Sequence, residues 1–177
     1  MRRLASFALT IGLCTVALSG CATQQPSQRP PPQSPVVIRG IPFPAPAYVA
    51  MASSIDLYAI KSSQVALTRA QDARLRDFAS MEVGAHQGLG SQLSFAGRRL
   101  NLLPSAELLP DHQRMLDTLE STMDFDATYV RQQIQVHEAA LKLHSDFAAR
   151  GESPTMRPVA ANAVPIIRSH LERLRGM

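Results

Sequence analysis

The prolines of this chain divide it into two parts that obey different structural rules. Eight of the 13 prolines lie between residues 22 and 46, where Gln and Ser are also frequent. Proline has no backbone donor and a fixed φ, so it blocks both helices and sheet ladders. We therefore expect residues 21–46 to form a flexible tether, which spans at most about 75 Å at about 3.1 Å per residue in polyproline II.

From Tyr48 onward, prolines are rare and stand where helices would begin or end. Apolar residues recur at spacings of three, four and seven, as in Leu75, Phe78, Leu89 and Leu93, and no run alternates with the period of a strand. The predicted helices run from about Tyr48 or Ser53 to Ala70, from Asp72 to before Pro104, from Asp111 to Ser121, from about Asp124 to Gly151, and from Ser153-Pro154 onward.

Four of these helices are long and amphipathic, and short connections join them. This pattern predicts an all-α domain over residues 47–177, folded as an antiparallel four-helix bundle. The segment from Asp111 to Ser121 adds a short extra helix between the second and third long helices. An open helical array is the alternative.

Polar residues at the helix ends give more detailed expectations. Ser53 or Ser54 is the expected cap of the first helix, and Asp72 that of the second, because their side chains accept from free backbone N–H groups. Asp124 and Asp126 stand at the start of a long helix, where carboxylates favour the N-terminal dipole. We interpret this acidic pair as capping rather than as acid–base chemistry.

Glycine and proline give further local predictions. Gly151 is expected to end its helix in the left-handed conformation. The glycines of Gly84–Gly90 lie inside a helical pattern, which predicts close approach of a neighbouring helix. Ser153-Pro154 opens the last helix with Pro at the first position, and Pro158 lies near its first turn. Pro165 should kink or split that helix.

Residues 1–20 have the features of a bacterial lipoprotein signal peptide. Arg2 and Arg3 precede an apolar run, Ala5–Leu18, that is shorter than the roughly 20 residues of a transmembrane helix and fits the about 7–15 of a secretory signal. Leu18-Ser19-Gly20-Cys21 resembles a lipobox, which predicts cleavage before Cys21 and a lipid such as palmitate on its thiol. An ordinary signal peptide, cut near Ala22, is the alternative.

The lipid on Cys21 would anchor the protein to a membrane, since two or more acyl chains attach stably. Proteins retained at the inner membrane typically carry Asp after the cysteine, and here Ala22 follows. We therefore expect the cell envelope, at the outer membrane facing the periplasm. Cys14 lies within the signal and Cys21 carries the lipid, so the mature chain has no thiol left for a disulfide, a metal or a nucleophile.

Charge and motifs exclude several function classes. The chain has 18 basic and 14 acidic residues, a net charge of +4 that falls to +2 once Arg2 and Arg3 are removed. No cluster of Lys and Arg with interleaved aromatics occurs, so we expect no nucleic-acid partner. A Gly-x-Ser-x-Gly elbow and a phosphate-binding glycine loop are also absent. We expect no enzyme activity and no cofactor.

Three of the five histidines are predicted to lie on the core side of three different helices. These are His86, His137 and His170, and facing helices of a bundle can build a metal site from such residues. Bundle di-metal sites, however, use a carboxylate three residues before a histidine, where this chain has Val83, Ile134 and Ile167.

We therefore expect no metal and interpret these three histidines as hydrogen-bonded core residues, with metal binding as the alternative. Glu82 stands four residues before His86 and is expected to form an ordinary contact between successive helical turns. His112 and His144 are expected to be more exposed and receive no role.

The order of short motifs from Tyr48 to the C-terminus resembles the DUF 4142 family, a bacterial domain of unknown function found in exported proteins. The matching pieces are Leu75-Arg76-Asp77-Phe78-Ala79 leading to His86, Phe125-Asp126 followed by Tyr129 and His137, and Val164-Pro165 leading to His170-Leu171. The resemblance implies a ferritin-like bundle and an exported location, and no activity.

This chain departs from the family pattern at three places. Family members usually have Asp-His where this chain has Ala85-His86 and Val136-His137, and a Glu-rich first helix where it has Ala59-Ile60-Lys61. The resemblance therefore implies that any carboxylates of a carboxylate–histidine site are lost here.

Together these features predict a non-enzymatic envelope lipoprotein whose bundle binds an unknown envelope partner or has a structural role. The alternative is a metal-binding or stress-related ferritin-like protein that uses the core histidines. A carrier of a small molecule, held in a gap between helices, is a third hypothesis.

Overall fold

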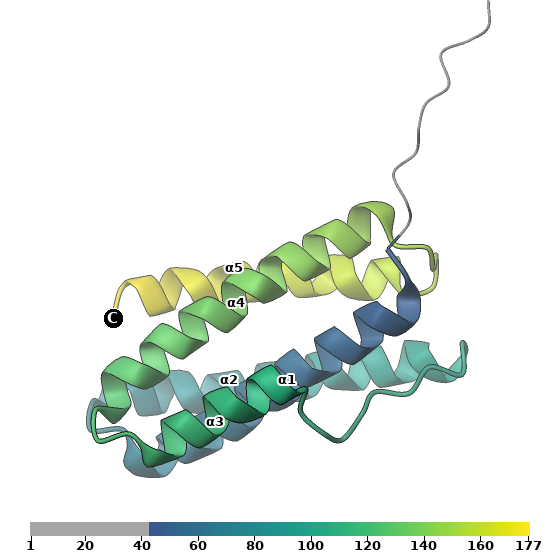
Figure 1. Ribbon diagram of the computed structural model, residues 1–177. Helices are drawn as coiled ribbons and strands as arrows, with labels where there is room; N and C mark the ends of the chain where they lie inside the picture. Colours follow the sequence, from purple (N-terminus) through teal and green to yellow (C-terminus); the bar gives the residue numbers. More distant parts are fainter. Residues whose placement is uncertain (1–42) are drawn as a thin grey trace, which may run out of the picture. The chain divides into compact units, whose positions relative to one another are not determined.

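A computed structural model describes residues 43–177 as a bundle of five helices (Figure 1). The helices are α1 (Ala45–Arg69), α2 (Ala73–Arg98), α3 (Pro110–Ser121), α4 (Phe125–Arg150) and α5 (Arg157–Arg175). The predicted fold class, a four-helix bundle with a short extra helix between the second and third long helices, is confirmed. The expected signal peptide, Cys21 and the tether up to residue 42 lie outside the described residues.

Two helical hairpins make up the bundle. Helix α1 packs along α2, and α4 packs along α5, each pair being joined by a short connection (Figure 1). Contacts of α1 with α4 and of α2 with α5 hold the hairpins together, while α3 lies against α1 and α4. None of the described helices is both long enough and apolar enough to span a membrane.

Two apolar clusters fill the bundle at different levels along its helices. The larger cluster includes Tyr48 and Phe147, whose rings stack with their centroids 3.9 Å apart. The second includes Phe78 and Tyr129, from α2 and α4. Between these clusters, α2, α4 and α5 contribute the buried polar residues Glu82, His86, Gln133, His137 and His170. A polar layer therefore crosses an otherwise apolar core.

Helix α1 begins earlier than predicted, and neither expected serine caps it. Pro44 precedes the first turn, and the backbone N–H of Ala45 donates to Oε1 of Glu152 at 2.7 Å. Ser53 and Ser54 are buried inside the helix. Glu152, from the other hairpin, supplies the missing acceptor. Helix α1 therefore begins at Ala45, two residues before the predicted domain start at residue 47.

The acidic residues at helix ends act partly as predicted. Asp72 caps α2, since its side chain accepts from the backbone N–H of Arg74 at 2.8 Å. Asp124 precedes α4 but makes no capping hydrogen bond. Asp126 accepts instead from the backbone N–H groups of Gln71 and Asp72, at 3.0 and 2.9 Å. Asp126 therefore fastens the turn between α1 and α2, and the side chain of Asp124 does not cap α4.

Helix α5 starts at Arg157, three residues after Pro154. Ser153 accepts from the backbone N–H of Met156 and forms a turn before the helix. Pro158 lies in the first turn, as predicted. Of the predicted kink or split at Pro165, the split is wrong, because α5 continues through this exposed residue to Arg175.

The roles predicted for the glycines differ from the roles that the packing around them indicates. Gly151 has φ −59°, outside the left-handed region, but a Cβ there would lie 2.6 Å from the Phe147 ring. Close packing of that ring therefore explains the glycine. A Cβ on Gly84 or Gly88 would meet no atom within 4 Å, so close helix approach is not their role.

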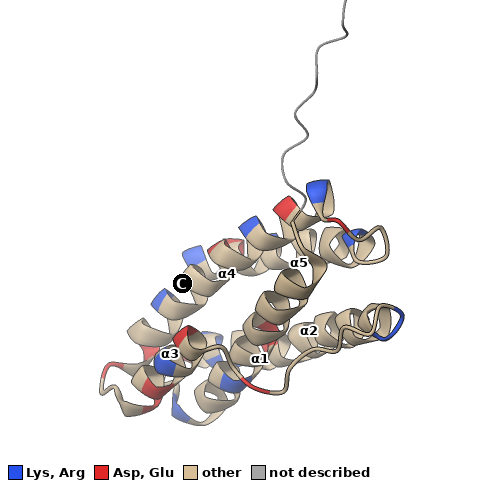
Figure 2. Cartoon of the chain, turned by 45° about the vertical axis from the view of Figure 1, so that its right-hand side comes forward, with Lys and Arg blue, Asp and Glu red and all other residues tan. Residues whose placement is uncertain are grey.

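The charged residues of the outer surface are mixed in sign. Figure 2 shows basic and acidic positions alternating along α4. Lys142 pairs with Asp146 at 2.7 Å, and Glu138 pairs with Arg175 at the same distance. Exposed pairs of this kind contribute at most about 1 kcal/mol each, so the core sets the stability of the bundle.

Candidate metal centre

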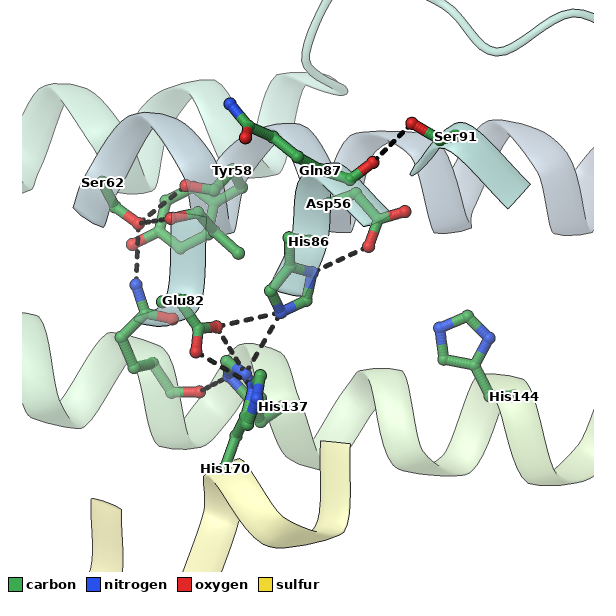
Figure 3. Close-up of polar contacts among 12 residues, drawn as sticks. Asp56, Tyr58, Ser62, Glu82, His86, Gln87, Ser91, His137, His144 and His170 are labelled. Carbon is green, nitrogen blue, oxygen red and sulfur yellow. Dashed lines mark hydrogen bonds and ion pairs between the residues drawn. The ribbon is translucent and has the colours of Figure 1, made fainter. Parts of the chain in front are cut away.

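The polar layer holds three histidines around one glutamate (Figure 3). Glu82 and His86 lie one turn apart on α2, His137 on α4 and His170 on α5. Glu82, His86 and His137 have no exposed surface, and His170 keeps 4%. Residues from both hairpins therefore meet at one buried position in the core.

The carboxylate of Glu82 lies at the centre of this cluster. Its Oε1 is 2.9 Å from Nε2 of His86 and 2.7 Å from Nε2 of His137, while its Oε2 is 2.9 Å from Nδ1 of His170. One potential ligand atom from each of the four residues lies within 4.8 Å of the others. A single ion placed between them would reach all four.

Two of the imidazoles are oriented from outside the cluster. Nδ1 of His86 is 2.8 Å from Oδ1 of Asp56, on α1, and Nδ1 of His137 is 2.8 Å from the backbone oxygen of Gln133. Each acceptor favours a proton on Nδ1, so Nε2 is the atom that would coordinate an ion once it carries no proton. Metal-binding histidines in proteins are oriented by outer contacts of this kind.

The short contacts to Glu82 do not have the directions of hydrogen bonds. Both of its oxygens, and Nδ1 of His170, are buried without a hydrogen-bond partner of acceptable geometry. Buried polar atoms are rarely left in this condition. A cation bound between the three imidazoles and the carboxylate would satisfy these atoms.

For Glu82 and His86, the interactions with neighbouring charges outweigh the effect of burial on the pKa. Burial acts to raise the pKa of Glu82, but its contacts with His137, His170 and His86 hold that pKa well below its usual range. Burial acts to lower the pKa of His86, but the carboxylates of Asp56 and Glu82 raise it to about 10. Burial also raises the pKa of Asp56, and His86 opposes this shift. Glu82 is therefore ionised in the core.

Further hydrogen bonds stiffen the layer. The side-chain amide of Gln133 donates to Ser62 Oγ at 2.7 Å, and this hydroxyl in turn donates to the backbone oxygen of Tyr58. Tyr129 and Ser63, on α4 and α1, share a hydrogen bond of 2.7 Å. These contacts tie α4 to α1 beside the centre and fix the helix that carries His137.

The structure brings together the three histidines that the sequence places on the core side of different helices. The predicted contact between Glu82 and His86 is present. The expectation that the carboxylates of such a site are lost is wrong, because Glu82 also contacts the other two histidines and Asp56 contacts His86. Glu82 continues the apolar stripe of α2, which includes Phe78 and Leu89, and a glutamate within such a stripe is the signal that could have identified it.

The two other histidines are less exposed than expected. His144 is buried at 3% exposure, with Nδ1 3.0 Å from the Tyr48 hydroxyl. Burial, with a smaller effect of His86, lowers the pKa of His144 to about 4. His112 is half-buried, and its Nδ1 lies 2.7 Å from the Ser54 hydroxyl. Neither residue belongs to the cluster around Glu82.

Fold and site together define a helical-bundle protein with a buried histidine–carboxylate cluster. The family model described as Domain of unknown function (DUF4142) matches residues 42–177, and the chain belongs to this family. The comparison with curated proteins finds no match.

Solved structures share the fold at low sequence identity. CopM in its Cu(II)-bound form has a TM-score of 0.65 and 18% identity, over 77% of this chain and 96% of that one. A DUF305 fragment from Deinococcus radiodurans has a TM-score of 0.63 and 18% identity, over 74% of this chain and 92% of that one. At this identity the likeness concerns the fold alone.

Proposed function

We propose that this protein binds one divalent transition-metal ion through Glu82, His86, His137 and His170, and that it does so as a non-enzymatic lipoprotein of the bacterial envelope. One observation carries the proposal: three imidazoles and a carboxylate converge in the core, and the carboxylate oxygens have no properly directed hydrogen bond. A purely structural network would be expected to satisfy them.

The donor set favours a particular group of ions. Three nitrogen atoms and one carboxylate oxygen suit Zn(II) or Cu(II), whereas Cu(I) prefers sulfur ligands and none of the four donors is sulfur. Glu82 and the neighbouring Asp56, when both are ionised, balance a charge of +2. The similar fold of CopM, solved with Cu(II), Cu(I) and Ag, makes copper the first ion to test.

The closed geometry supports holding an ion rather than catalysis. Catalytic zinc sites keep one coordination position for water or substrate, while sites with four protein ligands are structural. Here four protein ligands are available and three have no exposed surface. Sequestration or delivery of an ion fits this arrangement better than turnover of a substrate.

The envelope location is supported by the sequence. Leu18-Ser19-Gly20-Cys21 fits a lipobox, Ala22 favours the outer membrane facing the periplasm, and the proline-rich tether would hold the bundle away from the lipid. A metal-binding domain anchored in this way would meet ions that enter the periplasm.

Metal content tests the proposal directly. The purified protein is incubated with copper(II) sulfate or zinc chloride, desalted and analysed by mass spectrometry for bound metal. We expect about one ion per chain. The double variant His86→Ala/His137→Ala should retain none, while His112→Ala, which changes a histidine outside the cluster, should bind like the wild type.

A wild-type protein without bound metal would instead support the interpretation of the three histidines as hydrogen-bonded core residues. If the wild-type protein retains no metal and the double variant only melts at a lower temperature, the cluster is a structural network and the proposal fails.

A further inference from the structure

A cleft of about 730 Å³ leads from the surface to one side of the candidate centre. Residues of α1, of α2 and of the connector after α2 line it, and both Asp56 and His86 belong to this lining. Asp56 keeps 5% of its side-chain surface exposed, whereas His86 has none. The cleft therefore ends at the pair of residues that forms the outer edge of the centre.

His86 connects this cleft with the buried donors. Its Nδ1 lies 2.8 Å from Asp56, on the cleft side, and its Nε2 lies 2.9 Å from Glu82, within the centre (Figure 3). Glu82 and His137 are fully buried and do not line the cleft. His86 thus lies between the cleft and the buried donor atoms.

A glycine keeps the second oxygen of Asp56 accessible. Oδ1 of Asp56 is engaged by His86, while Oδ2 lies 3.9 Å from the position of a Cβ on Gly90. A longer side chain at Gly90 would extend into the space beside this oxygen. The absence of a side chain at Gly90 thus leaves space beside Oδ2 of Asp56 at the floor of the cleft.

The other polar groups of the lining suit a hydrated cation. The hydroxyls of Ser91 and Ser94 and the side-chain amide of Gln87 lie along the same wall. Arg98 is the one basic residue of the lining besides His86, and it is eight residues from Gly90, or about 12 Å along the helix. The carboxyl group of Asp56 at the floor is therefore separated from the positive charge of Arg98.

From these contacts we infer that the cleft is the entry route for the metal ion, with Asp56 Oδ2 as its first protein ligand and His86 as the side chain that moves to admit it. This inference rests on the proposed function, and it concerns the rate of loading rather than the final affinity. Blocking the cleft should slow binding and release equally, because both use the same path.

The test compares two leucine substitutions on one helix. Gly90→Leu places a side chain in the cleft, whereas Gly88→Leu makes the same change where a Cβ meets no atom within 4 Å. Co(II), whose absorption spectrum reports coordination, is mixed with the purified protein in a stopped-flow instrument. We expect Gly90→Leu to slow loading by about tenfold at unchanged equilibrium affinity, and Gly88→Leu to load at the wild-type rate.

Each result has a defined meaning. Wild-type loading by Gly90→Leu would overturn the inference, while failure of the wild-type protein to bind any metal would instead refute the proposed function. If Gly90→Leu loses equilibrium binding, Ser94→Leu decides, because it fills the cleft one turn farther from Asp56. Slower loading by Ser94→Leu supports the route, and an unchanged rate overturns it.

Discussion

Oε1 of Glu82 lies 2.7 Å from Nε2 of His137, so a contact between α2 and α4 joins the two helical hairpins at the level of the polar layer. An ion bound between these residues would hold the hairpins together. The same contact places an ionised carboxylate in the core, where an unpaired charge is costly. The candidate centre is therefore important for both stability and binding.

Replacing Glu82 by Gln should reduce metal affinity by at least about 100-fold, since the change keeps the shape of the side chain but removes the only charged ligand. Competition of the purified variant with a chromophoric chelator for Cu(II) measures this loss. Glu138→Gln is the control, because this residue lies on the exposed face of α4 and pairs with Arg175, away from the cluster. Equal affinities of Glu82→Gln and wild type would contradict the proposed ligand set.

Replacing Asp56 should weaken the centre although Asp56 is not one of its four ligands. Its carboxylate orients His86, and loss of such outer contacts typically costs about 10- to 100-fold in metal affinity. Asp56→Asn should bind more weakly than the wild type, and Asp56→Ala more weakly still. The absorption spectrum of bound Co(II) should also change. A variant with a lower melting temperature but an unaltered spectrum and affinity would show that Asp56 has only a structural role.

The buried His144 should make the metal-free protein less stable in acid. Its pKa is about 4 in the folded state and near 6.5 when unfolded, so the unfolded chain binds the extra proton first. Stability is then complete above about pH 6.5 and declines as the pH falls toward about 4. Between pH 7 and pH 5 we expect a loss on the order of 2 kcal/mol from this residue.

Urea unfolding of the metal-free protein at both pH values measures this effect. His144→Gln lacks the titrating group, so its stability should fall less than that of the wild type over the same interval. A parallel decline in the two proteins would assign the acid sensitivity to other groups.

Substituting Gly151 by Ala should destabilise the bundle by about 1–3 kcal/mol, because the added Cβ would overlap the buried ring of Phe147. That ring is stacked on Tyr48 and has little room to move. Gly88→Ala, in an exposed helical position, should instead stabilise by about 0.5–1 kcal/mol. Urea denaturation of both variants gives the comparison, and a neutral Gly151→Ala would show that the ring adjusts.

Changing Cys21 to Ser should release the protein from membranes, since the hydroxyl cannot carry the lipid expected on the thiol. Fractionation of cells that express each form, with detection in the membrane and soluble fractions, gives the answer. Membrane retention of the Cys21→Ser protein would contradict lipid anchoring.

The helices and the cap of α2 were predicted well from local sequence. The spacing of Leu75, Phe78, Leu89 and Leu93 indicates a helix whatever packs against it, and Asp72 caps that helix through its own backbone neighbours. The short helix predicted from Asp111 to Ser121 begins one residue earlier, at Pro110. These features depend on contacts within a few residues.

Features that depend on a distant partner were missed. Glu152 caps α1 from the other hairpin, Asp126 binds the turn between α1 and α2, and Gly151 is required by a ring that packs on Tyr48. Nothing in the residues next to each of these reveals the partner, because the partner comes from elsewhere in the chain.

The candidate centre shows the same division. The sequence alone places His86, His137 and His170 on the core sides of three helices, since helical periodicity fixes which face each residue occupies. Only the tertiary structure decides that the three faces meet at one level, that Glu82 lies between the imidazoles and that Asp56 orients one of them. Periodicity fixes direction around a helix axis, whereas the level at which helices meet is set by packing of the two apolar clusters on either side.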